Sequence, residues 1–236
     1  MQKLLMVVIG VGLVANCALA VGPKHFLLAK EAPKLELLAL FNQWVYGDDT
    51  ESRGGELGIE AGGEEFKSII LKGPKDKLLN VENKAPFSAL ELENNALIWK
   101  DFTKAFPEGT YQLSGKNRNG KQVSKKFSLN YDSFPARATI TAPAHKASVP
   151  AAGLVVTWNA PPPGVNIDGI DLWIGSLGED ELEFEIKLDP AATNYTIPAE
   201  LLRPGTGYVM GVHFRRAGEG VHYTSGHVIE FAVAGQ

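Results

Sequence analysis

Serine and histidine side chains that could perform catalysis lie close together near the C-terminus. Ser225 and His227 are two residues apart, so the alternation of a β-strand places both on one face. A serine nucleophile needs a base that a third group orients, and no orienting acid is evident beside this pair. Nucleotide-binding loops, zinc-peptidase helices, nucleophile elbows and paired-cysteine metal sites are all absent from the sequence. We therefore expect no catalytic residue, no cofactor and no enzymatic activity.

Three histidines near the C-terminus raise the question of a metal site. His213, His222 and His227 fall in the last two expected strands and in the connection between them. A zinc site needs three or four ligands in a defined geometry, but His213 points outward if its apolar strand neighbours point inward. We interpret the three as scattered surface histidines and assign them no metal.

An acidic loop is a second metal candidate. Asp48, Asp49 and Glu51 lie between Gly47 and Gly54 in a polar stretch. Calcium takes oxygen ligands on flexible loops, but this spacing matches no established calcium loop. A solvated acidic turn is the favoured interpretation, and calcium binding is the weaker alternative.

Trp173 is the residue of most interest for ligand binding. The expected strand 170–174 places its aliphatic residues on one face and Trp173 on the other. The outward residues of the neighbouring strand include Gly211, His213 and Arg215, and the missing side chain of Gly211 leaves room for a large ring. We predict that any ligand-binding face includes Trp173, His213 and Arg215. The alternative is that the ring covers the glycine or packs against the first domain.

Short strands separated by turns make up most of the first half of the chain. Residues 35–46 are mostly apolar and fit either a strand or a helix, because periodicity does not distinguish short apolar runs. Strands are expected at residues 56–61, 66–72 and 77–82, with hairpin turns at 62–63 and 73–76.

A change of pattern follows at residues 88–106. Ser88 precedes Glu91 at the spacing of a capping box, so one or two short helices are expected here. Strands at 110–114 and 122–130 then flank Asn119-Gly120, which is a strong hairpin signal. The first half is thus predicted to be β-rich with a short helical insertion.

A new strand pattern begins after a boundary at residues 131–135. The expected strands are at residues 154–158, 170–174, 182–188, 195–197, 208–214 and 227–233. Short strands separated by turns favour a β-sandwich.

Residues 136–233 resemble a fibronectin type III domain. Residues 156–158, with the sequence Val-Thr-Trp, precede two prolines and are similar to the family's strand B, whose tryptophan lies in the core. Residues 194–197 and 202–208 resemble strand E and the corner that leads into strand F. This resemblance implies that Tyr208 is buried and that its hydroxyl bonds the backbone near residues 202–205.

The match to that family has limits. The connection through residues 198–201 is longer than usual, and no Arg-Gly-Asp tripeptide is present, so integrin binding is not implied. More loosely, residues 106–111 and the following hairpin make the whole chain similar to exported bacterial proteins with two β-rich domains. That group has no established activity, so the similarity implies little about function.

Residues 1–20 have the organisation of a signal peptide. Lys3 precedes an uncharged apolar run, and residues 18–20 supply small residues at the cleavage site. The mature chain is expected to begin at Val21, so Cys17 leaves with the signal and the exported protein has no thiol. A transmembrane helix and a lipid-modified Cys17 are the alternatives.

Composition and pattern together define the expected protein. A net charge of -4 gives no reason to expect nucleic acid or anionic membrane as a partner. We expect a mainly β chain with a signal peptide at 1–20 and a β-rich domain at 26–134 that holds a short helical insertion. A fibronectin type III-like, immunoglobulin-like β-sandwich is expected at 136–236.

The expected function follows from the missing catalytic pattern. We expect a secreted or periplasmic, non-enzymatic protein that binds or scaffolds, with a protein or glycan of the cell envelope as partner and no membrane span after signal cleavage. The alternative is an accessory domain protein of a secreted hydrolase that acts on polysaccharide.

Overall fold

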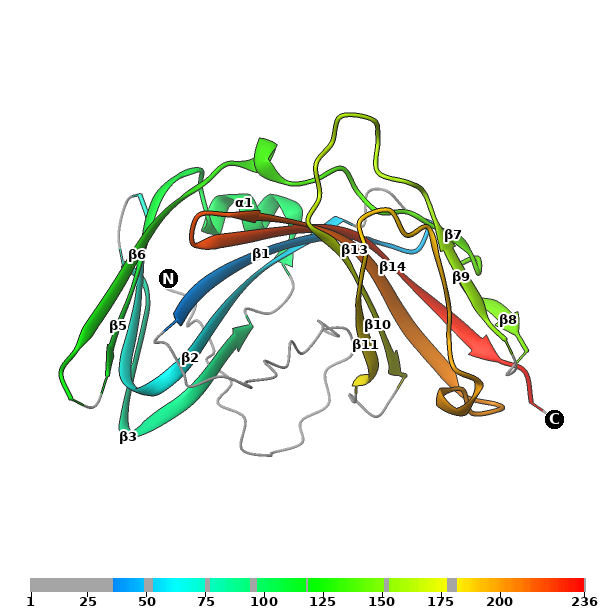
Figure 1. Cartoon of the computed structure of the whole chain (residues 1–236), viewed down its shortest axis with the longest axis horizontal. Coiled ribbons are helices and arrows are strands. Elements are labelled where there is room, and N and C mark those ends of the chain that lie inside the picture. Colours follow the sequence, from blue (N-terminus) through cyan, green and yellow to red (C-terminus); the bar gives the residue numbers. More distant parts are fainter. Residues whose placement is uncertain are drawn as a thin grey trace. The chain divides into compact units, whose positions relative to one another are not determined.

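The structure is a computed structural model in which strands predominate (Figure 1). It describes residues 36–48, 53–74, 77–93, 97–117, 119–150, 153–177 and 182–235. The expected signal peptide with Cys17, and Asp49 and Glu51 of the acidic loop, lie outside the described residues. No helix in the described part of the chain is both long and apolar enough to cross a membrane.

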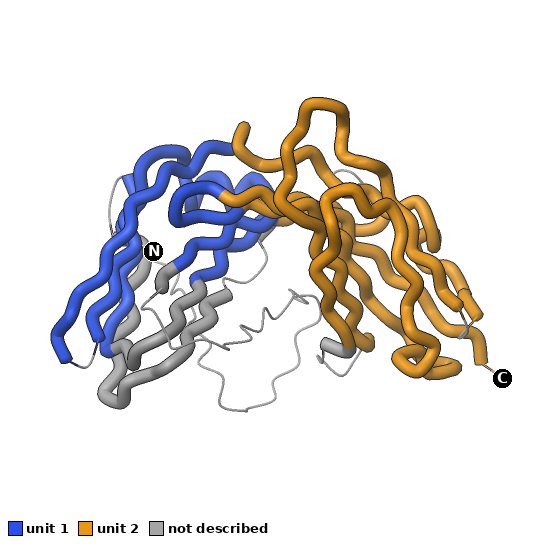
Figure 2. Tube along the Cα trace, in the orientation of Figure 1, with its two compact units in different colours: residues 1–42, 55–131, 218–222 blue, residues 43–54, 132–217, 223–236 orange. Residues whose placement is uncertain are grey.

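The chain divides into two compact units, which Figure 2 distinguishes by colour. Unit 1 contains residues 1–42, 55–131 and 218–222, and unit 2 contains residues 43–54, 132–217 and 223–236. Each unit is therefore discontinuous in sequence, and residues 43–54 belong with the C-terminal half. The contiguous ranges 26–134 and 136–236 stay a prediction for the domain boundaries.

Unit 1 is a sheet in which β1, β2, β5 and β6 follow one another, with β3 and β4 also paired to β2. Its elements are β1 (Glu36–Tyr46), β2 (Arg53–Lys72), β3 (Lys77–Glu93), β4 (Leu97–Ile98), α1 (Trp99–Ala105), β5 (Gly109–Asn117) and β6 (Gln122–Leu129). The ends of β1 and β2 that adjoin the connection between them belong to unit 2.

Several expectations for this half are settled by these elements. Residues 36–46 form a strand, and the expected hairpin turn at 62–63 is wrong, because β2 continues through both glycines and only its register shifts there. The capping box at Ser88 is also wrong, since Ser88 lies within β3 and the helix covers only Trp99–Ala105. The Asn-Gly hairpin is confirmed: β5 and β6 pair antiparallel, and Gly120 has a φ of 83°.

Aromatic rings fill the interior of unit 1. Phe41 makes edge-to-face contacts with Phe102, Phe106, Tyr111 and Phe127, at centroid distances of 6.0–6.3 Å. Such pairs add to the stabilisation from burial itself. They fix α1 and the β5–β6 hairpin against β1.

Unit 2 is a sandwich of two sheets. The larger sheet has the order β11-β10-β13-β14, continues to β1, and carries β8 on β14, while the smaller has the order β12-β9-β7. The elements are β7 (Ile140–Ala142), β8 (Ala147–Val149), β9 (Val155–Trp158), β10 (Gly169–Ser176), β11 (Leu182–Leu188), β12 (Asn194–Thr196), β13 (Gly207–Gly218) and β14 (Val221–Val233). This three-plus-four arrangement is the layer structure of a fibronectin type III-like, immunoglobulin-like fold.

The core between the two sheets follows the expected alternation. Trp158 from β9 and the inward residues of β10, β13 and β14 are all buried in one cluster. Its members on the central strands are Ile170, Leu172, Ile174, Tyr208, Met210, Val212, Phe214, Ile229, Phe231 and Val233. We call this side of the larger sheet the inner face and the opposite side the outer face.

The corner that leads into β13 is confirmed. Tyr208 is fully buried, its hydroxyl donates to the Leu201 carbonyl at 3.2 Å, and it accepts from the Arg203 N–H at 2.8 Å. Gly205 makes the turn with a φ of 76°, which favours glycine. The hydroxyl thus ties the connection after β12 to the start of β13.

Candidate functional site

The predicted ligand residues lie on the outer face of unit 2, but they are not exposed. Trp173 pairs directly with Gly211 of β13, and only 1% of its surface is accessible. The expectation that this tryptophan faces solvent is wrong, because the ring is buried against Gly211. A methyl group added at Gly211 would fall 2.7 Å from Trp173 Cζ2.

The same arrangement recurs across the outer face. His213 is 3% accessible and covers Gly226 of β14, where an added methyl group would lie 2.6 Å from Nδ1. Trp44 of β1 covers Gly54 of β2 in the same way, at 2.7 Å from Cε2. A large ring beside a glycine restores the contacts that a strand glycine lacks. The outer face is therefore packed by rings that lie over neighbouring glycines.

A small apolar cluster completes this face. Trp173, Val209 and Val228 are buried together, and Trp44 and Tyr46 pack against them. The Trp173 and His213 rings also meet, with centroids 6.4 Å apart. Trp173 Nε1 has no hydrogen-bond acceptor among the residues that the structure describes. The outer face therefore contains both apolar side chains and buried polar groups.

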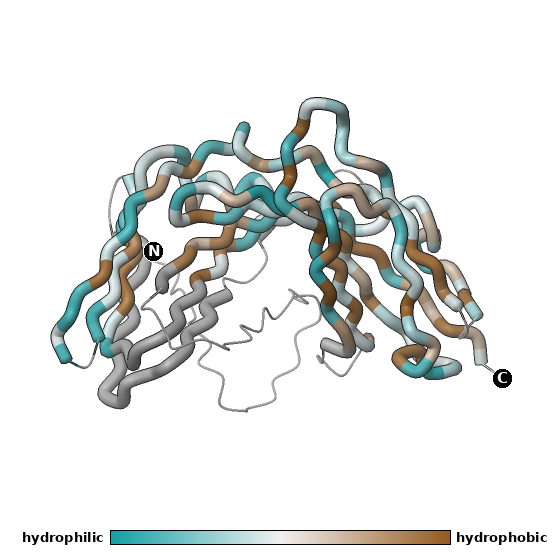
Figure 3. The backbone as a smooth tube through the Cα atoms, viewed as in Figure 1, coloured by the Kyte–Doolittle hydropathy of each residue, from teal (hydrophilic) through white to brown (hydrophobic). Residues whose placement is uncertain are grey.

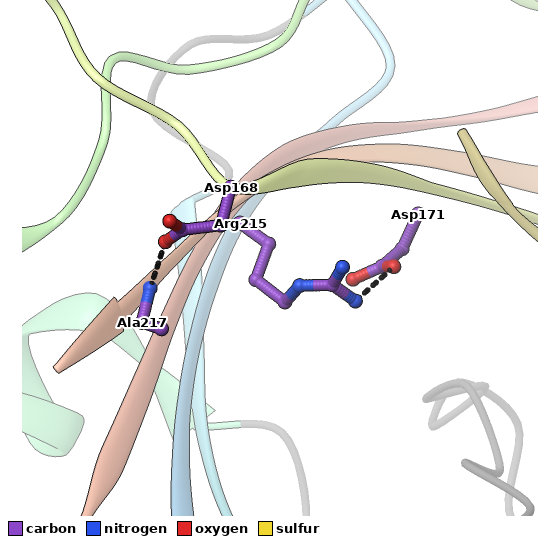
Figure 4. Close-up of polar contacts among 4 residues, drawn as sticks. All are labelled: Asp168, Asp171, Arg215 and Ala217. Carbon is purple, nitrogen blue, oxygen red and sulfur yellow. Dashed lines mark hydrogen bonds and ion pairs between the residues drawn. The ribbon is translucent and has the colours of Figure 1, made fainter. Parts of the chain in front are cut away.

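Arg215, the third predicted residue, pairs with an acid (Figure 4). Its Nη1 lies 2.8 Å from Asp171 Oδ1, and 19% of the arginine side chain and 5% of the aspartate side chain are accessible. The guanidinium also lies against Gly169, which pairs with Arg215 in register. Asp168 accepts from the Ala217 N–H beside it. The arginine therefore neutralises a buried carboxylate at the end of β10.

A second cluster of polar side chains in unit 2 surrounds Gly47, the residue that follows β1. His227 Nδ1 accepts from the Ile140 N–H at 3.1 Å, so its proton is on Nε2, which donates to the Gly47 carbonyl at 2.8 Å. Burial lowers the pKa of His227 below its ordinary value, and the charge of Arg137 acts in the same direction. The Gly47 bond opposes this shift without reversing it. The neutral ring thus joins β7, β14 and the end of β1.

Tyr46, His145 and Glu230 lie on the other side of Gly47. The Tyr46 hydroxyl donates to the Glu230 carboxylate, and burial, followed by this carboxylate, raises the pKa of Tyr46. His145 Nδ1 accepts from the Glu230 N–H at 3.1 Å, and the ring packs over Gly47 and edge-on to Tyr46. We call Tyr46, His145, His227 and Glu230 the Gly47 cluster. Its bonds hold strands in place.

Ser225 does not work with His227 as a nucleophile and base. The Ser225 hydroxyl accepts from Gln43 Nε2 at 2.9 Å, and Arg53 donates to the oxygen of the same amide. Both ring nitrogens of His227 are engaged with the backbone. The two side chains share a face, as the spacing predicts, but each is used to attach β1 to β14.

Sequence reasoning identified some of these residues and missed others. It singled out His227 and Asp48 but not Tyr46, His145 or Glu230, whose partners lie far away in the chain. Within the described ranges, no three histidines, cysteines or acids are placed to hold a metal ion. Calcium binding by Asp48, Asp49 and Glu51 stays a prediction, because two of these lie outside the described residues.

Comparisons with known proteins give no assignment to a family. No family model matches the chain, and no curated protein matches it. Among solved structures, the chain is similar to a "Biofilm associated protein - BSP domain", with 12% identity, a TM-score of 0.27 and coverage of 85% of this chain and 29% of that one. It is also similar to the chicken CNTN1 FN1-FN3 domains, with 12% identity, a TM-score of 0.28 and coverage of 74% and 61%. The chain spans less than two thirds of either structure.

Proposed function

We propose that this is an exported, non-enzymatic binding or scaffolding protein that acts at the cell envelope or outside the cell. One observation carries the proposal: in unit 2 the side chains suited to chemistry are used to join strands. His227 bonds backbone at both nitrogens, Ser225 accepts from Gln43, and Glu230 accepts from Tyr46. A general base or nucleophile must instead be within reach of a substrate atom.

Export is the first part to test. The organisation of residues 1–20 supports secretion or delivery to the periplasm, with Val21 as the first residue of the mature protein. N-terminal sequencing of the protein from the culture medium and from the periplasm measures this. Detection of a retained, lipid-modified Cys17 would show that the protein is anchored to a membrane and not released in soluble form.

Binding and hydrolysis can be separated in one experiment. Purified protein is mixed with an isolated envelope fraction and sedimented, and the supernatant is assayed for released reducing sugar. We expect retention in the pellet and no release above a heat-denatured control. Release of sugar that is lost in Ser225→Ala or Glu230→Gln would establish a hydrolase, and absence of retention would remove the binding role.

Of the predicted ligand residues Trp173, His213 and Arg215, the first two are buried, so Arg215 alone is retained as a proposed ligand contact of unit 2. Arg215 is the member of this set that solvent reaches most, with 19% of its side chain accessible. Arg215→Lys should keep the charge opposite Asp171 and weaken envelope retention if the guanidinium contacts the ligand. Arg216→Lys, an exposed neighbour on the other side of β13, is the matched control. Equal retention of both variants and the wild type would leave the three residues a structural role only.

A further inference from the structure

One side of the sheet in unit 1 is exposed and rich in lysine. It forms where β5 pairs with the end of β2 on one edge and with β6 on the other. The register aligns three rows across these strands, followed by a pair at one end. These are Lys72–Gln112–Lys126, Ile70–Ser114–Ser124, Ser68–Lys116–Gln122 and Thr110–Ser128, which together we call the basic face.

Alternation turns these rows away from the core. Their sequence neighbours Ile69, Leu71, Tyr111, Leu113 and Phe127 are all buried. Hydrophobic positions that interrupt the hydrophilic ones along β6 are visible in Figure 3. Lys72, Lys116 and Lys126 are exposed, so their ammonium groups lie in solvent above the surface of the sheet.

The charge of the basic face is opposite to that of the whole chain. Its rows contain three lysines and no acid on β2, β5 and β6, and β3 adds Lys77 opposite Lys72 and Glu82 opposite Ser68, whereas the protein has a net charge of -4. Like charges concentrated on one surface raise the local concentration of oppositely charged partners. A surface of this kind favours an anionic partner over a neutral or cationic one.

The middle of the basic face holds a fixed set of polar groups. Gln112 Nε2 donates to Ser124 Oγ at 2.8 Å, and Ser114 Oγ lies 3.1 Å from the same hydroxyl. These bonds run between β5 and β6 and restrain the side chains along the sheet surface. Amide and hydroxyl groups held in this way can exchange hydrogen bonds with the hydroxyls of a sugar at a reduced entropic cost.

The spacing of the lysines suits an extended ligand. Lys72 and Lys126 are two strand spacings apart, about 10 Å between backbones, and Lys116 is two rows away, about 14 Å along the strand direction. Small ligands are bound in concave pockets, whereas this is one side of a sheet. The geometry therefore fits a chain polymer with regularly spaced anionic groups.

We propose that the basic face binds an anionic polysaccharide that carries one carboxylate per sugar. The lysines contact carboxylates, and Gln112, Ser114 and Ser124 contact hydroxyls. The rows contain no arginine for bidentate phosphate contacts and no aromatic ring for base stacking, which disfavours nucleic acid. This inference rests on the proposed binding function and names its ligand class.

The test uses polygalacturonate as the probe. Its fully methyl-esterified form is the uncharged control, and duplex DNA is the alternative polyanion. Binding of the protein is measured by affinity gel electrophoresis and biolayer interferometry at 50 and 300 mM NaCl, concentrations chosen because the Debye length falls from roughly 14 Å to about 6 Å between them. We expect binding to polygalacturonate alone, weakened several-fold at the higher salt concentration.

Three variants locate the binding site. Combined Lys72→Gln, Lys116→Gln and Lys126→Gln should weaken binding about tenfold or more, because three charge contacts are lost together. The same sites changed to Arg should keep binding. A control that removes three other exposed lysines, Lys100→Gln, Lys104→Gln and Lys187→Gln, has the same net charge and should bind as the wild type. Unchanged melting curves establish that all three variants fold.

Four results would overturn the inference. They are no binding to polygalacturonate, equal binding to its methyl ester, tighter binding to DNA, or equal losses in the basic-face and control variants. The proposed function fails separately, by loss of retention on the envelope fraction. A protein that is retained on envelope but does not bind polygalacturonate would keep the proposed function and lose this ligand class.

Discussion

The basic face of unit 1 and the outer face of unit 2 have similar sequence patterns and opposite exposure. In both, polar residues alternate with apolar residues that fill a core. Lys116 and Lys126 on the basic face are exposed, whereas His213 and Asp171 on the outer face are buried. Alternation thus assigns a residue to a side of a sheet, but it does not decide whether that side meets water.

Glycine is the visible difference between the two faces. The outer face has Gly169, Gly211 and Gly226, each covered by a large side chain from the neighbouring strand. The basic face has a side chain at every position of its rows. A glycine at an outward strand position therefore indicates close packing by a neighbour, and a continuous set of serine, glutamine and lysine indicates a solvated surface.

Trp173→Ala should have the largest effect of the changes that test this comparison. The ring is 1% accessible, so its removal leaves a cavity above Gly211. We expect a loss of about 3–5 kcal/mol in the free energy of unfolding, as for other buried large aromatics. Urea unfolding followed by circular dichroism measures it. A mutant with wild-type stability and lost envelope binding would instead make Trp173 a ligand contact.

Gly211→Ala is the reciprocal control for that change. The added methyl group clashes with the Trp173 ring and should reduce stability by about 1–3 kcal/mol. In the Trp173→Ala background the clash is absent, so the same glycine substitution should cost much less. Additive losses in the double mutant would show that the ring and the glycine do not interact.

Arg215→Met should have the next largest effect. It leaves the Asp171 carboxylate, with 5% of its side chain accessible, without its arginine. Removing one partner of a buried charge is destabilising, and the partial exposure of the arginine limits the effect to about 2–3 kcal/mol. The stability is measured in urea, with Arg216→Met as an exposed control. Addition of Asp171→Leu should restore part of the loss, and a further decrease would count against the pairing.

Tyr208→Phe tests the inner face of the same sheet. The substitution removes the acceptor of the Arg203 N–H and the donor to the Leu201 carbonyl. We expect a loss of about 1–2 kcal/mol, smaller than that of a whole ring. Unfolding midpoint and slope in urea measure it, with Tyr195→Phe as the control. Equal midpoints for both variants and the wild type would show that the hydrogen bonds of the Tyr208 hydroxyl do not stabilise the corner before β13.

His227 should make unit 2 less stable in acid. Its folded pKa lies below the ordinary value, so folding favours the neutral ring, and the stabilisation is complete above the unfolded pKa of about 6.5. It decreases as the pH falls through the folded pKa, with a slope of at most about 1.4 kcal/mol per pH unit for one proton. The free energy of unfolding of the wild type should decrease as the pH is lowered from 7.5 to 5.0. That of His227→Gln should change less over the same range. Parallel pH profiles would remove this role.

Ser124→Ala should have the smallest effect. Ser124 is exposed on the basic face, and its hydrogen bonds to Gln112 and Ser114 are replaced by water. Changes at such surface positions are usually within about 0.5 kcal/mol. A melting curve measures the stability, and a large loss would mean that the basic face is packed rather than solvated.

Local patterns in the sequence predict much of the sandwich. The alternation of Ile170, Leu172 and Ile174, and the turn before Tyr208, depend on neighbours in sequence, and both are confirmed. A short helix within residues 88–106 is confirmed by α1, but the capping box at Ser88 is wrong, because the pairing of β3 with β2 outweighs that local signal. Propensity is a weak guide where distant strands supply the hydrogen bonds.

The candidate site was harder to predict for the same reason. Gly211 beside Trp173 indicates that a ring can cover a glycine, and this alternative was recognised from the sequence. The exposure of Trp173 could not be derived, since it depends on packing that alternation does not encode. The Gly47 cluster had no signal, because Tyr46 and Glu230 are 184 residues apart.

That separation has a consequence for the order in which unit 2 is made. Residues 43–48 leave the ribosome before the Ser225, His227 and Glu230 groups that bond them, which follow 180–184 residues later in the chain. Synthesis adds only about 5–20 residues each second, so these early residues wait roughly ten seconds or more for their partners. The final closure of unit 2 therefore waits until β14 has left the ribosome.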